Sequence, residues 1–236
     1  MKAAVKTKTA SKMSSEERRA AIIKAVRQVF AERGFDGTTT RALAQAAGVS
    51  EALLFKHFPN KEALFSAMQL SCCNEGDQDV FGRLFALEPS ASTLVLMTHF
   101  FVSKVAGECP TDADERAVQT RLMLRSLAED GDFARIMLRR VATDWAPRVE
   151  ECMKAAVAAG EAVATPLRPA LGAWFTHHVA AMMRIFFLPD EPVADYGVSR
   201  EKAIEQAVWF VLRGVGLKEE VIKRHYNARA LALFTG

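Results

Sequence analysis

The chain has 236 residues, of which half are hydrophobic and a quarter are charged, which excludes a disordered chain and fits one globular domain or a small domain joined to a larger one. No apolar run approaches the roughly 18 residues of a membrane-spanning helix, and the lysine-rich start lacks the apolar stretch of a secretory signal. We therefore expect a soluble, cytoplasmic protein with no membrane partner. Cys72, Cys73, Cys109 and Cys152 lack CxxC spacing and nearby histidines, so we expect reduced thiols and no metal site.

The charge is distributed unevenly along the chain. Residues 1–62 hold twelve Lys and Arg against six Asp and Glu, a net charge of +6, whereas the remaining residues hold nineteen against twenty-two, a net charge of −3. A basic segment joined to a mildly acidic one is typical of a nucleic-acid reader attached to another module, because phosphates attract clustered cations. Short basic tails also occur in proteins that do not bind nucleic acid, so charge alone leaves both readings open.

The first expected elements are a tail and a capped helix. Residues 1–13 are rich in Lys, Thr and Ala without an apolar period, so we expect a disordered basic tail. Ser14 has capping-box spacing to Glu17, and the apolar residues that follow recur at three- and four-residue steps. These signals predict a helix that begins at Ser14 and ends at Gly34.

Two short helices are expected next. The second helix is predicted to begin at Thr39 or Thr40, to run through Ala47 and to end at Gly48, which can adopt the left-handed conformation. A third follows from Ser50 to about His57. Two short helices around a glycine turn are the pattern of a helix-turn-helix. Helix pairs of this kind also occur in proteins with no DNA role, so the pattern alone leaves that alternative open.

The rest of the chain keeps a helical apolar spacing, and no strand pattern competes with it. After a break at Pro59 and Asn60, a fourth helix should open at Lys61. Further helices are expected near 78–106, 112–128, 132–160, 169–188, 199–216 and 218–234. We expect an all-α protein with a tail over 1–13, a helix-turn-helix DNA-binding domain over 14–62 and a larger helical domain over 63–236.

A dense set of residues with intact spacing lies between Arg18 and Leu64. It comprises Ile22-Ile23, Val29-Phe30, Gly34-Phe35, Gly37-Thr38-Thr39, Thr40-Arg41, Leu43-Ala44, Ala47-Gly48-Val49-Ser50, Leu54-Phe55, His57-Phe58 and Asn60-Lys61-Glu62. This segment resembles the N-terminal domain of the TetR family of bacterial transcriptional repressors. The resemblance implies a three-helix DNA-binding domain followed by a helical ligand-binding and dimerisation domain. It also implies a homodimeric repressor that a small apolar or amphipathic effector releases from a palindromic operator.

The resemblance further implies which side chains face double-stranded DNA. They are Thr39, Thr40, Arg41, Ser50, Glu51, Ala52, Phe55, Lys56, His57 and Lys61. Arg41 can donate two bonds to the O6 and N7 atoms of guanine, while Thr40, Lys56, His57 and Lys61 would face phosphates. The family usually has Tyr where this chain has Phe55, which can contact a thymine methyl or pack inside. Glu51 can accept from cytosine N4 or act near the helix start, and both readings stay open.

The larger domain offers candidates for an effector site. The resemblance places such a site among its helices, and the candidates are Met97, His99, Phe100, Phe101, Arg121, Arg125, Met137 and Trp145. The same residue types fill ordinary helical cores, and the polar ones occur equally as surface or structural residues, so composition does not separate a pocket from a filled interior.

A dimer face is expected on two apolar helices. Across a two-fold axis, two helices from each chain would form a four-helix bundle, as the resemblance also implies. The candidates are Leu171, Trp174, Phe175, His178, Met182, Ile185, Ile204, Val208 and Val211. The alternative is that these helices are internal core.

The sequence also bears on catalysis. It contains no glycine-rich phosphate loop, GxSxG, HExxH or Cys/His arrangement, so we expect neither an enzyme nor a cofactor. The remaining alternative is a helical adaptor or protein-interaction module that has lost DNA binding. The operator, the regulated genes, the effector, repression against activation, and a redox role of Cys72 and Cys73 are left open.

Overall fold

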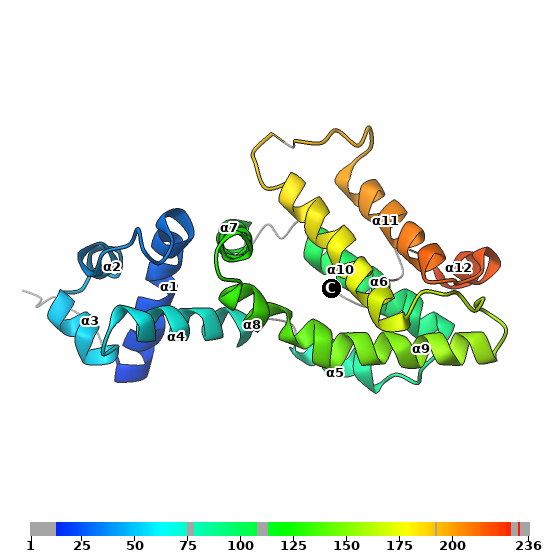
Figure 1. Ribbon diagram of the computed structural model, residues 1–236, viewed down its shortest axis with the longest axis horizontal. Coiled ribbons are helices and arrows are strands. Elements are labelled where there is room, and N and C mark those ends of the chain that lie inside the picture. Colours follow the sequence, from blue (N-terminus) through cyan, green and yellow to red (C-terminus); the bar gives the residue numbers. More distant parts are fainter. Residues whose placement is uncertain (1–12, 75–77, 108–112, 192, 228–230, 232–236) are drawn as a thin grey trace, which may run out of the picture. The chain divides into compact units, whose positions relative to one another are not determined.

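The structure is a computed structural model that describes residues 13–74, 78–107, 113–191, 193–227 and 231. The chain divides after Asn74 into two compact units, residues 1–74 and 75–236 (Figure 1). In the described ranges the regular secondary structure is helical, apart from one isolated β-bridge between Ala162 and Leu217. The predicted all-α class is confirmed. None of the described helices is long and apolar enough to cross a membrane.

Over its described residues 13–74, the first unit contains four helices, which are α1 (Ser15–Arg33), α2 (Thr40–Ala46), α3 (Glu51–His57) and α4 (Lys61–Asn74). The predicted capping box is present, since the Ser14 hydroxyl accepts from the Glu17 amide and the Glu17 carboxylate accepts from the Ser14 amide at 2.7 Å. Gly34 ends α1 with a φ of 70°, a backbone conformation that favours glycine. These local signals therefore place the helix ends where the sequence predicts them.

The core of the first unit joins all four helices. Ile22, Val26 and Phe30 from α1 are buried together with residues of the other three helices, Leu43, Leu54, Leu64 and Met68. A ring cluster of Phe30, Phe35 and Phe65 adds aromatic contacts, with centroids 4.9 Å apart for Phe30 and Phe65. Because α4 packs against α1, the expected boundary near residue 62 falls inside α4, and the unit extends to Asn74.

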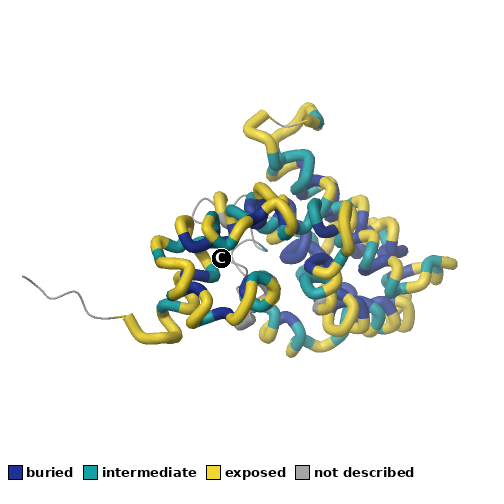
Figure 2. The backbone as a smooth tube through the Cα atoms, turned by 60° about the vertical axis from the view of Figure 1, so that its left-hand side comes forward, coloured by how far each residue is buried: buried dark blue, intermediate teal, exposed yellow. Residues whose placement is uncertain are grey.

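The second unit is a bundle around α6. Its helices are α5 (Gln78–Ala86), α6 (Ala91–Ala106), α7 (Ala113–Ala128), α8 (Asp132–Arg140), the π-helix η1 (Val141–Trp145), α9 (Ala146–Ala158), α10 (Pro169–Phe186), α11 (Arg200–Gly214) and α12 (Glu219–His225). Helix α6 is buried along most of its length and packs against α9, α10, α11 and α12. In Figure 2, buried and exposed positions alternate along most of the other helices, as expected for helices packed on one side.

Two segments that were expected as single helices are interrupted. The segment 78–106 breaks before Ser90, whose hydroxyl accepts from the Thr93 amide and caps α6. The segment 132–160 contains a π-helical turn between α8 and α9. Pro147 follows this turn directly and has no N–H to continue an α-helical ladder. The last expected helix, 218–234, is described as α12 up to His225, and most positions after Asn227 lie outside the described residues.

The interior of the second unit holds a histidine whose charged form is disfavoured. The ring of His177 in α10 lies between those of Trp174 and Phe101, with centroid distances of 6.1 and 6.0 Å. Burial, assisted by the neighbouring His178, lowers the pKa of His177 from 6.5 to about 4. The ring is therefore neutral near neutral pH.

We expect acid to destabilise the folded chain through His177. Above pH 6.5 the ring is neutral in the folded and the unfolded chain, whereas between pH 6.5 and about 4 only the unfolded chain binds the proton. The free energy of unfolding should therefore fall as the pH falls, by up to about 3 kcal/mol from this ring. Denaturant unfolding at about pH 7.5 and about pH 4.5 measures this loss. His177→Gln should remove it, and His178→Gln at the exposed neighbour should not. Equal acid sensitivity in the two variants would contradict this role of His177.

Candidate functional site

Helices α2 and α3 are fixed relative to each other by their caps and by the turn between them. The Thr39 hydroxyl accepts from the Ala42 amide, and the Ser50 hydroxyl accepts from the Leu53 amide, each at 3.2 Å. Gly48 makes the turn with a φ of 62°. Thr39 and Ser50, both expected at the DNA, thus act as N-caps, and their exposed positions leave them at the same surface.

One face of α3 is open. Leu54 is the buried residue of this helix, while Glu51, Ala52, Phe55 and Lys56 are exposed. The Phe55 side chain is 41% exposed, so it lies at the surface and not in the core. The last turn carries Lys56 and His57, of which His57 is half-buried. A short helix with a small, partly basic outer face fits the major groove of a duplex.

Arg41 stands beside this face. It is exposed in the first turn of α2, and it makes no ion pair or hydrogen bond with the residues that the structure describes. A guanidinium without an internal partner keeps all of its donors for an external acceptor. The geometry therefore leaves the predicted contact of Arg41 with a base available.

Thr40 and Glu51 contact each other and thereby join α2 to α3. The Thr40 hydroxyl donates to the Glu51 carboxylate at 2.8 Å. A hydroxyl has one proton, so Thr40 cannot donate to a phosphate while this bond is intact. The expected contact of Thr40 with a phosphate and the bond to Glu51 are thus mutually exclusive. The cap that was considered for Glu51 is supplied by Ser50.

Lys61 points away from the open face. Its ammonium group donates to the carbonyl oxygens of Phe35 at 2.9 Å and Thr38 at 3.1 Å, and it lies 4.1 Å from the centre of the Phe35 ring. These contacts hold the turn between α1 and α2 against the start of α4. The sequence placed Lys61 at a phosphate because it opens a helix, but its charge is already used inside the unit.

We expect Lys61→Ala to change the stability of the fold and Lys56→Ala to change the salt dependence of DNA binding. Lys61→Ala should lower the free energy of unfolding by about 1 to 3 kcal/mol, since it leaves two carbonyl oxygens without their charged donor. It should not change the slope of DNA affinity against salt. Lys56→Ala at an exposed position should leave stability unchanged and reduce that slope by about one. Thermal unfolding and anisotropy titrations at several salt concentrations test the pair, and a reduced slope for Lys61→Ala alone would contradict the assignment.

The expected effector residues do not form one open site. Met97, His99, Phe100 and Phe101 of α6 and Trp145 of η1 are all buried in the core. His99 lies 3.4 Å from the Tyr226 hydroxyl, and burial lowers the pKa of His99. By contrast, Arg121 is exposed, Arg125 pairs with Glu129 at 3.3 Å, and Met137 is half-buried. The buried members belong to the core, whereas Arg121 lies at the surface.

The expected dimer residues separate into two sets. On α10, Leu171, Phe175, His178 and Met182 are exposed at three- and four-residue steps, and Trp174 and Ile185 are half-buried beside them. On α11, the expected residues Ile204, Val208 and Val211 are buried in the core of their own chain, so they present no surface to a partner. Phe210 is 68% exposed on α11 and was missed, although it lies opposite the buried stripe of that helix.

Metal and thiol chemistry find little support in the described part of the chain. No group of three or more His, Cys, Asp or Glu residues in those ranges could hold a metal ion. Cys152 is buried, and burial raises the pKa of its thiol. Cys72 and Cys73 fall in the last turn of α4, but their side chains, like all of Cys109, lie outside the described residues.

The first unit is similar in sequence to known proteins. Residues 22–68 match the model of bacterial regulatory proteins of the tetR family. The HTH-type transcriptional repressor Rv1474c of Mycobacterium tuberculosis is 47% identical over 51 residues, which are 22% of this chain and 27% of the relative. The nucleoid occlusion factor SlmA of a Marinomonas species is 28% identical over 157 residues, 66% of this chain and 73% of the relative. With Rv1474c, the match thus spans about a quarter of the relative's length.

The fold of most of the chain also has a counterpart among solved structures. The crystal structure of AibR in complex with isovaleryl coenzyme A and operator DNA aligns with 82% of this chain and 97% of its own, with a TM-score of 0.58. The sequence identity of 20% means that this likeness concerns the fold alone. The expected architecture, an N-terminal helix-turn-helix domain followed by a larger helical domain, is confirmed.

Proposed function

We propose, from the premise that residues 22–68 are an N-terminal domain of the tetR family of bacterial regulatory proteins, that this protein is a ligand-responsive DNA-binding transcriptional regulator. In this proposal it acts as a homodimeric repressor in the cytoplasm, and a small effector releases it from a palindromic operator. The observation that carries the proposal is the open face of α3, fixed by capped ends and backed by the buried Leu54.

In this proposal the side chains of α2 and α3 have different roles at the duplex. Ala52 and Phe55 offer small and apolar surface that suits a thymine methyl, and Arg41 supplies donors for a guanine. Lys56 and His57 at the end of α3 supply positive charge for the backbone. Two such faces, set about one helical turn apart by a dimer, read a palindrome that one face alone would hold weakly.

Effector control requires that one ligand prefer one arrangement of the dimer. A small molecule lowers operator affinity when it binds better to a conformation in which the two reading helices are wrongly spaced. AibR, which shares the fold, is recorded with both isovaleryl coenzyme A and operator DNA. This supports a second unit that holds an effector and a first unit that holds DNA. We propose a binding function and not a catalytic one, since the matched family consists of regulatory proteins and Rv1474c is a transcriptional repressor.

Selection of bound duplexes from a random pool, followed by anisotropy titration, tests the proposal. We expect enrichment of a palindromic sequence, an affinity at least about a thousandfold above that for a scrambled duplex, and a steep loss of affinity with salt. A chain that binds neither duplex at low salt would instead be the helical adaptor considered from the sequence. Binding without any preference between the duplexes would contradict the regulator.

A further inference from the structure

The second unit has an open groove whose lining is mostly apolar. It lies between α7, α8, η1 and α10 and has a volume of about 350 Å³. Leu127, Ala134, Leu138 and Trp174 line it, and Arg135 and Arg139 of α8 also contribute. Small-molecule sites are typically concave, mainly apolar, and armed with a few polar groups, in the size range of roughly 300 to 1,000 Å³. The groove has these properties.

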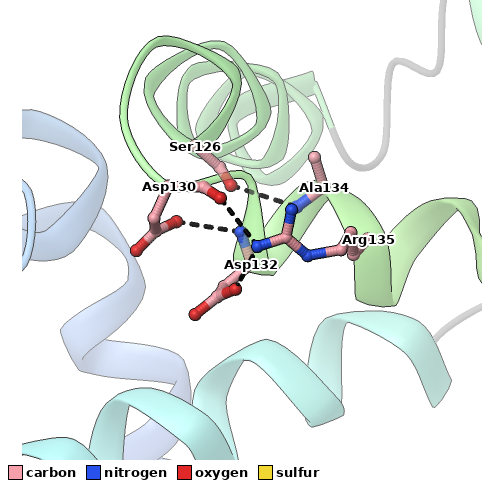
Figure 3. Close-up of polar contacts among 5 residues, drawn as sticks. All are labelled: Ser126, Asp130, Asp132, Ala134 and Arg135. Carbon is pink, nitrogen blue, oxygen red and sulfur yellow. Dashed lines mark hydrogen bonds and ion pairs between the residues drawn. The ribbon is translucent and has the colours of Figure 1, made fainter.

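The turn that borders the groove contains several polar contacts, which Figure 3 shows. The Ser126 hydroxyl accepts from the Ala134 amide at 3.1 Å, and the Asp130 carboxylate accepts from the Asp132 amide at 2.8 Å. One nitrogen of Arg135 donates to the Asp130 carbonyl and to the Asp132 carboxylate, at 2.7 and 2.6 Å. Arg135 is thus partly neutralised and fixed in place.

Arg139, one helical turn further along α8, differs from Arg135. It is exposed, and no hydrogen bond or ion pair joins it to any described residue. Residues four apart in a helix lie on the same face, so both guanidinium groups belong to one side of the groove. The charge of Arg135 is paired with Asp132, whereas the charge of Arg139 has no partner among the described residues. This border of the groove therefore has an excess of positive charge.

A series of ring contacts leads inward from the groove. Trp174 lines the groove, and its ring lies 6.1 Å from His177, which lies 6.0 Å from Phe101. Phe101 packs in turn on Trp145 at 4.5 Å. Along this path two ring nitrogens, Nδ1 of His177 and Nε1 of Trp145, are buried without a hydrogen-bond partner in the described residues. The Trp145 side chain is only 2% exposed, and an unpaired buried N–H costs stability.

The π-helical turn connects these two features. η1 contributes Ala142 to the lining of the groove, and it ends at Trp145, which carries one of the unpaired nitrogens. Single π-turns are rare and are found frequently at functional sites, where they redirect side chains. The irregular turn therefore lies at the border of the groove and continues into the buried ring cluster.

We propose that this groove is the effector site and that its ligand is an amphipathic organic anion. The anionic end pairs with Arg139, next to Arg135, and the apolar body lies along Leu138 and Trp174. This inference rests on the proposed function and specifies its effector by chemical class.

Calorimetry on the full chain without DNA tests the proposal with three probes that share one alkyl chain length. They are decanoate, decanol and decyltrimethylammonium, each used below its aggregation concentration. We expect decanoate to bind about tenfold more tightly than decanol or the ammonium compound, because only the carboxylate pairs with Arg139.

Matched variants test the role of Arg139. Arg139→Ala should remove the preference for the carboxylate, and Arg121→Ala, which removes an exposed arginine of α7 that does not line the groove, should preserve it.

The results also distinguish this proposal from the function on which it rests. Equal binding of the carboxylate, alcohol and ammonium head groups, or equal effects of Arg139→Ala and Arg121→Ala, would overturn the groove as an anion site. No binding of any probe by a chain that still selects a palindromic duplex would overturn the effector class and leave the regulator standing. Carboxylate binding that depends on Arg139 in a chain that ignores DNA would support the site and contradict the regulator.

Discussion

Arg41→Ala is expected to weaken specific operator binding by about fivefold to more than a hundredfold, because a bidentate arginine contact with guanine is worth about 1 to 3 kcal/mol in discrimination. Arg41 is exposed beside the open face of α3, and no internal partner competes for its donors among the described residues. A symmetric dimer would lose this contact in both half-sites. The loss should therefore exceed that of any single phosphate contact.

Titrations with two duplexes distinguish a base contact of Arg41 from a phosphate contact. Anisotropy titrations with the selected operator and with a scrambled duplex should show a large loss for the first and a small loss for the second. Arg121→Ala removes the same charge from the second unit and should change neither affinity by more than about twofold. If Arg41→Ala weakened both duplexes equally, Arg41 would be a phosphate contact and the base assignment would be wrong.

The parts of the fold that could be predicted from sequence are those set by local chemistry. Ser14 and Glu17 satisfy each other's backbone across one turn, and Gly34 and Gly48 adopt positive φ values that few other residues tolerate. Thr39 caps α2 within three residues of itself. Each of these signals acts over one turn, so none depends on how the rest of the chain packs. The sequence therefore predicts the helix ends of the first unit.

Side chains that depend on tertiary contacts were less predictable. The opening position of α4 suggested a phosphate for Lys61, but Phe35 and Thr38, more than twenty residues away, present carbonyl oxygens to its ammonium group. Likewise the bond between Thr40 and Glu51 joins two helices whose relative placement a sequence does not reveal. From sequence alone a charged side chain is predicted to be free for a ligand, because its acceptors elsewhere in the chain are not known.

The faces of the apolar helices posed a related problem. Helix α11 has a regular apolar stripe of Ile204, Val208 and Val211. The periodicity predicts that this stripe is buried, but it does not tell whether the same chain or a partner subunit covers it. The structure covers it from within the same unit and leaves Phe210 on the opposite side exposed. The groove beside Trp174 had no sequence signal, because its lining comes from four separate elements.

The second large effect is expected at the apolar stripe of α10. Phe175 is 50% exposed, Met182 is 45% exposed and Leu171 is 44% exposed, and the spacing places all three on one side of the helix. Phe210 on α11 adds a further exposed ring, and α10 and α11 pack against each other. Contiguous apolar surface of this kind is typical of a protein interface. We propose that it forms the dimer bundle, with Phe210 in place of the buried residues of α11.

The double variant Phe175→Glu with Met182→Glu should therefore be monomeric, since it places two carboxylates, and their symmetry copies, in an apolar interface. Operator affinity should fall by more than about a hundredfold, because the second reading helix would no longer be held near its half-site. Sedimentation velocity measures the first effect and anisotropy the second. Val157→Glu changes an exposed apolar residue of α9 and should leave both properties intact. A double variant that sediments as a dimer with an unchanged melting temperature would place the interface on another surface, and with it the two-fold axis that sets the spacing of the half-sites.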